Sequence, residues 1–83
     1  MAIRGYVLIE TEVGSARAVG EQMQRMEHKD AKLVAVDTVT GPFDVIVQLE
    51  AEDLDKLGNC ITEGIQGVAG VKRTTTCPAV RLG

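Results

Sequence analysis

The stretch that decides the fold is residues 32–50, KLVAVDTVTGPFDVIVQLE. It contains two runs rich in β-branched residues, 32–40 and 43–50, and β-branched residues favour strands. Gly41-Pro42 separates the runs, and this pair interrupts a strand. Apolar side chains recur at every second position of the later run: Phe43, Val45, Val47 and Leu49. The stretch therefore predicts two antiparallel strands joined by a short turn.

Upstream of the hairpin, residues 3–11 (IRGYVLIET) predict another strand. Its apolar side chains occupy both parities, which is typical of a central strand covered on both faces. A helix is expected to begin at Gly14-Ser15 and to end at 28–30. Its apolar stripe follows a spacing of three and four: Ala16, Val19, Met23 and Met26.

Downstream of the hairpin, residues 51–68 predict a second helix, with Asp53 capping its first turn. The expected apolar stripe consists of Leu54, Leu57, Ile61, Ile65 and Val68. Gly58 and Gly64 lie inside this helix, where we expect them to let a neighbouring backbone approach closely. Residues 71–80 predict a last strand, and Pro78 places its end at a sheet edge or outside the sheet.

The elements follow the order β-α-β-β-α-β, which predicts an α+β, ferredoxin-like fold with a four-stranded antiparallel sheet. Right-handed crossovers put both helices on one face of that sheet. With 83 residues, we expect a single domain over 1–83. Because the first two strands are apolar on both parities, the uncovered face should carry apolar surface. We therefore expect two chains to pack sheet on sheet, as in a dimeric α/β barrel.

Composition narrows the function. The net charge is −3 and the basic residues are scattered among acids, so direct nucleic-acid binding is not expected. The apolar run near the N-terminus is too short for a signal peptide or a membrane span, which favours a cytoplasmic protein. Cys60 and Cys77 are expected to be reduced structural thiols. With His28 as the single histidine, expected at the solvated surface, we predict no metal site and no cofactor.

No catalytic motif is recognisable in the sequence. The dense carboxylate cluster surrounds the start of the second helix, where negative charge favours the helix dipole: Glu50, Glu52, Asp53 and Asp55. The turn at 38–44 is more informative, because Gly41 allows a ligand to approach the backbone and Asp44 offers an acceptor for an ammonium group. By itself this pattern is also that of an ordinary hairpin turn with a capping aspartate.

Three segments carry a resemblance to a known family: YVLIET in the first strand, TGPFDVIVQLEAEDLDKL through the hairpin, and EGIQGVAGVKRTTT near the end. With its G-x-x-D pattern after the second strand, the chain resembles the ligand-binding and oligomerisation (RAM) domain of Lrp/AsnC-type transcription regulators. Those regulators carry an N-terminal helix-turn-helix domain, whereas this chain begins at the first strand of the sensor domain. It therefore resembles a stand-alone version of that domain.

The resemblance implies homodimers that assemble into octamers or similar rings, with amino-acid effectors bound between dimers. It implies that Asp44 pairs with the effector's α-amino group and that Gln66 reaches the effector from a neighbouring subunit. The other implied ligand-binding residues are Thr40, Gly41, Phe43, Thr75 and Thr76. It also implies a role in transcription exercised through other chains, with full-length Lrp/AsnC-type regulators as partners.

Three functions stay open on the sequence alone. The leading one is a non-enzymatic, amino-acid-binding oligomeric module. The second is a small dimeric α/β-barrel enzyme of the monooxygenase or isomerase type, for which Tyr6 and His28 would be the residues to test. The third is a structural oligomerisation protein without a ligand.

Overall fold

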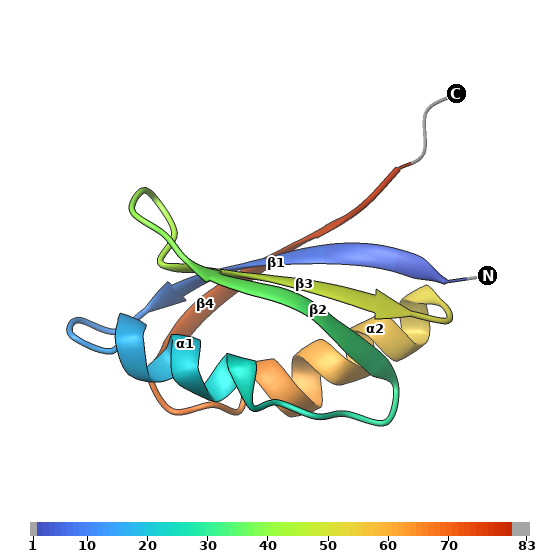
Figure 1. Cartoon of the computed structure of the whole chain (residues 1–83), viewed down its shortest axis with the longest axis horizontal. Helices are drawn as coiled ribbons and strands as arrows, with labels where there is room; N and C mark the ends of the chain where they lie inside the picture. Colours follow the sequence, from blue (N-terminus) through green and yellow to red (C-terminus); the bar gives the residue numbers. More distant parts are fainter. Residues whose placement is uncertain (1, 81–83) are drawn as a thin grey trace.

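The computed structural model describes residues 2–80. Its elements in chain order are β1 (Ile3–Thr11), α1 (Ala16–Gln24), β2 (Ala31–Thr38), β3 (Val45–Ala51), α2 (Leu54–Cys60), the π-helix η1 (Ile61–Ile65) and β4 (Val71–Pro78). The strands form one antiparallel sheet in the order β2-β3-β1-β4. All helices lie on the same face of that sheet (Figure 1). The predicted ferredoxin-like fold is confirmed, and β1 is central as its apolar pattern predicted.

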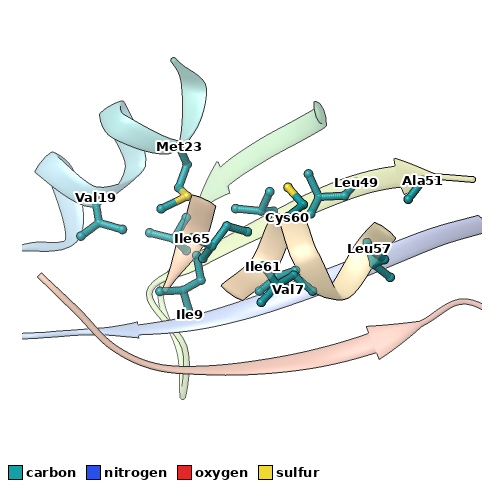
Figure 2. Packing of buried hydrophobic residues seen from close by; sticks show 12 residues of the cluster. Val7, Ile9, Val19, Met23, Leu49, Ala51, Leu57, Cys60, Ile61 and Ile65 are labelled. Carbon is teal, nitrogen blue, oxygen red and sulfur yellow. The ribbon is translucent and has the colours of Figure 1, made fainter. Parts of the chain in front are cut away.

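The core lies between the sheet and the helices. Side chains from the central strands point toward α1 and α2, and side chains from the helices meet them (Figure 2). Its fully or almost fully buried members are Val7, Ile9, Val19, Met23, Val45, Val47, Leu49, Ala51, Leu57, Cys60, Ile61 and Ile65. Gly5 brings β1 close to α2, because an added Cβ would lie 2.8 Å from Leu57 Cδ2. This core fixes β2 and β3 and thereby the connection between them.

The other face of the sheet, which we call the open face, is not covered by any described element. The strand registers place Tyr6, Leu8, Ile46 and Ala35 near its centre, together with Gln48. Ion pairs lie at its two ends, with Arg4 Nη2 3.2 Å from Glu50 Oε2 and Arg73 Nη1 3.6 Å from Glu10 Oε2. The apolar part of this face is narrower than the sequence suggested, because Leu33 and Val36 turn toward the helices.

The second helical segment differs most from its prediction. Residues 51–53 still belong to β3 and a turn, and helix α2 begins only at Leu54, after the predicted cap at Asp53. The Asp53 side chain accepts a hydrogen bond from Lys56 N at 2.8 Å, so the predicted cap is confirmed. Leu54, the first residue of this helix, lies outside the core with 61% of its surface exposed. Its assignment to the buried stripe was wrong.

The prediction for the two helical glycines was also wrong. A Cβ added at Gly58 would have no atom within 4 Å, and one at Gly64 would approach the Met26 side chain rather than a backbone. The segment Ile61–Ile65 instead winds as a π-helix, which directs both of its isoleucines into the core. Pro78 ends β4 at an edge of the sheet, as predicted.

Candidate functional site

The connection between β2 and β3 is a loop of residues 39–44 rather than a tight turn. It projects from the sheet on the side away from the helices (Figure 1). The loop closes through a hydrogen bond from Val39 N to Asp44 O at 2.8 Å. It is tied to the neighbouring strand by a second bond, from Asp44 N to Ile9 O at 2.8 Å. Both ends of the loop are therefore fixed by the sheet, whereas Gly41 and Pro42 at its tip are exposed.

Asp44 is half-buried, and its carboxylate lies against the end of β1. Its Oδ2 accepts a hydrogen bond from Thr11 N at 2.8 Å and a second from Thr11 Oγ1 at 3.1 Å. No sequence pattern predicts this contact, because Thr11 and Asp44 are 33 residues apart. Asp44 thus has a structural role in holding the loop, beside the ligand role that the sequence suggested.

Gly41 combines a special backbone conformation with open surroundings. Its φ of 156° is one that side-chain-bearing residues rarely adopt. A Cβ built at this position would have no neighbouring atom within 4 Å. The backbone at the tip of the loop is therefore accessible, and the half-buried Phe43 lies between this tip and Asp44 along the chain.

The remaining predicted site residues do not join the loop within one chain. Gln66 Nε2 donates a hydrogen bond to Thr74 Oγ1 at 3.0 Å, on the β4 side of the molecule. Thr75 pairs with Leu8 and Thr76 pairs with Val7, so these threonines face opposite sides of the sheet. The predicted set of seven residues therefore falls into a loop cluster and a β4 cluster. No described hydrogen bond joins the loop residues to the residues on the β4 side.

A further polar cluster brings together His28, Asp30 and Glu63, within 4.8 Å of one another. The prediction that His28 is solvated was wrong, since only 12% of its side chain is exposed. Its Nδ1 accepts a hydrogen bond from Asp30 N at 3.1 Å, so the ring proton sits on Nε2, 2.8 Å from Glu63 Oε1. Both ring nitrogens are thus engaged in tying the loop after α1 to η1, and neither has a lone pair available to a metal ion.

The cysteines differ in environment. Cys60 is buried in the core and Cys77 is exposed on β4. Burial raises the pKa of the Cys60 thiol, and the nearby carboxylates of Asp30 and Glu63 raise it further. Cys60 is therefore a protonated core side chain at neutral pH rather than a nucleophile.

Among residues 2–80, no helix has the length and apolarity needed to span a membrane.

Known proteins share both the sequence pattern and the fold of this chain. The model of the Lrp/AsnC ligand binding domain family matches residues 4–81. A search of curated proteins finds no significant match. Among solved structures, TTHA0845 from Thermus thermophilus is 31% identical, with a TM-score of 0.83, and the alignment covers 98% of this chain and 96% of that one.

More distant structures share the fold. AsnC of E. coli is 11% identical with a TM-score of 0.81, and the alignment covers 96% of this chain and 52% of AsnC. The transcriptional regulator NMB0573 of Neisseria meningitidis, solved as a complex with L-Met, is 12% identical with a TM-score of 0.77. The alignment covers 95% of this chain and 50% of that regulator. This chain therefore corresponds to about half the length of these two proteins.

Proposed function

Because the chain belongs to the Lrp/AsnC ligand-binding domain family, we propose that it binds an amino-acid effector and acts by self-association, without catalysing a reaction. The observation that carries this proposal is the loop at 39–44. It offers a half-buried carboxylate at Asp44 and an accessible backbone at Gly41. A carboxylate and main-chain groups suit the ammonium and carboxylate ends of an amino acid.

The proposed site spans two chains. Thr40, Gly41, Phe43 and Asp44 come from one subunit, and Gln66 comes from a neighbour. Thr75 and Thr76 are weaker members of the set because they face opposite sides of β4. Bound L-Met in the Neisseria regulator supports the choice of an amino acid as the class of effector.

The proposed assembly starts from the open face. Two chains would bury Tyr6, Leu8 and Ile46 against each other and form a homodimer, and dimers would close into an octamer or a similar ring. The ion pairs at both ends of this face, Arg4–Glu50 and Glu10–Arg73, would fix how the two sheets are aligned. A ligand held between dimers would shift this assembly by its differential affinity for the assembled and separate states.

We further propose that the protein works in the cytoplasm and influences transcription through other chains, by mixed assembly with full-length Lrp/AsnC-type regulators. Direct contact with nucleic acid is not part of this proposal, because acidic and basic residues are interspersed and the net charge is −3.

The test is the native mass of the purified protein, measured by light scattering with and without each of the twenty amino acids, together with calorimetric titration. We expect a mass of at least two chains, and heat of binding with at least one amino acid. Asp44→Asn should weaken that binding at least about tenfold, as expected for an ion pair reduced to a neutral hydrogen bond. Asp55→Asn, at an exposed position on α2, is the matched control and should bind normally. Absence of heat with all twenty amino acids would favour a structural oligomerisation protein instead.

A further inference from the structure

Thr11 occupies an unusual position at the end of β1. The pairing of β1 with β4 shifts register between Glu10 and Thr11, so the ladder is irregular there. Thr11 pairs with Val71 beyond this shift, and its backbone N–H donates to Asp44 Oδ2 at 2.8 Å. Thr11 Oγ1 lies 3.1 Å from the same oxygen. The last residue of β1 therefore supplies two donors to one carboxylate oxygen of the residue that precedes the adjacent strand β3.

The two carboxylate oxygens of Asp44 therefore differ in their hydrogen bonding. Oδ2 is engaged twice, while Oδ1 accepts no hydrogen bond from residues 2–80. A carboxylate with one oxygen fixed by two donors cannot rotate freely about its side-chain bonds. The backbone of Asp44 is fixed as well, through its hydrogen bond to Ile9 O at 2.8 Å.

We propose that Thr11 is a positioning residue that holds the Asp44 carboxylate so that Oδ1 is presented to the ammonium group of an amino-acid ligand. This inference rests on the proposed function. The ligand then meets an acceptor that is already oriented, so little conformational freedom of Asp44 is lost on binding. Threonine suits this role because its β-branched side chain has few χ1 rotamers in a strand.

The test compares Thr11→Val, which keeps the shape and removes the hydroxyl donor, with Thr11→Ser, which keeps the donor. Thr62→Val, at an exposed position of η1, is the matched control. Each of the twenty amino acids is titrated into the intact wild-type chain, and those that bind are titrated into the variants. We expect Thr11→Val to weaken binding about three- to tenfold, the effect of one hydrogen bond. Thr11→Ser should stay within about twofold of wild type, as should Thr62→Val.

A ligand-independent readout separates this inference from the proposed function. The Hα–Hβ coupling constants of Asp44, measured by NMR, should show one rotamer in the wild type and in Thr11→Ser, and averaging in Thr11→Val. Wild-type affinity in Thr11→Val, or a single Asp44 rotamer in that variant, would overturn the positioning role. If no amino acid binds the wild type, the proposed function fails, and the coupling constants alone decide whether Thr11 orients Asp44.

Discussion

The two faces of the sheet are made by the same strands, but their side chains differ in how deeply they are buried. On the helix side, Val7 and Val47 are fully buried. On the open face, their chain neighbours Leu8 and Ile46 are only half-buried. Successive side chains of a strand point to opposite faces, so one strand serves two surfaces at once. The core on the helix side is therefore complete within one chain, whereas the open face has a half-buried apolar centre suited to a second chain.

The largest effect is expected on the helix side. Leu49→Ala removes a fully buried side chain and should lower the free energy of unfolding by about 2–5 kcal/mol. Urea denaturation followed by circular dichroism measures this loss. Leu54→Ala removes the same atoms from an exposed position and should change stability by less than about 0.5 kcal/mol. Equal losses in the two variants would contradict the division between covered and exposed leucines.

Association of two chains through the open face can be tested by placing a charged side chain at its centre. Leu8 lies at its centre, opposite Ile46 on one side and Thr75 on the other. Leu8→Lys should prevent face-to-face association, because a buried unpaired ammonium is costly, while each separate chain keeps its core. Sedimentation should then show single chains with unchanged circular dichroism. An assembly that keeps its wild-type mass would mean that the chains associate through another surface.

The loop that borders the open face should show a smaller loss of stability. Asp44→Ala leaves the Thr11 backbone N–H and hydroxyl without their acceptor. We expect a loss of about 1–2 kcal/mol, beside the loss of ligand binding. Thermal unfolding measures the first effect and titration the second. A variant with wild-type stability would show that water replaces the carboxylate without cost.

The smallest effect concerns the cysteines, one in the core and one on the open face. The raised pKa of the Cys60 thiol lowers its thiolate fraction at neutral pH, and its reaction with iodoacetamide should begin only as the pH rises or the core opens. Cys77, exposed and paired with Tyr6, should be alkylated first in dilute protein. Its alkylation should slow at higher protein concentration if the open face is covered by a second copy. Mass spectrometry after timed quenching measures both rates, and faster labelling of Cys60 would contradict its burial.

The sequence predicted the element order and the central place of β1, because hydrophobic period reports which residues are covered. The sequence-based prediction placed the start of the second helix too early. The apolar residues Ala51 and Leu54 are three positions apart, and this spacing fits the end of a strand followed by a helix as well as one continuous helix. The Asp44 acceptor was predicted from its type and its turn. The contact with Thr11 was not, because it depends on the register between two strands far apart in the chain. The link from His28 to Glu63 was missed because it joins the loop after α1 to η1, 35 residues along the chain, and no sequence pattern marks that pair.

The two edges of the sheet, β2 and β4, both carry features that hinder pairing with a strand of another chain. The register of β2 against β3 shifts between Leu33 and Ala35, which leaves Val34 outside the regular ladder at the outer edge. The opposite edge ends at Pro78, which has no N–H to offer an incoming strand. A bulge and a proline are both features that hinder strand addition at an edge. Continuous growth into fibrils by edge pairing is therefore disfavoured on both sides, even though the chain is small and rich in valine.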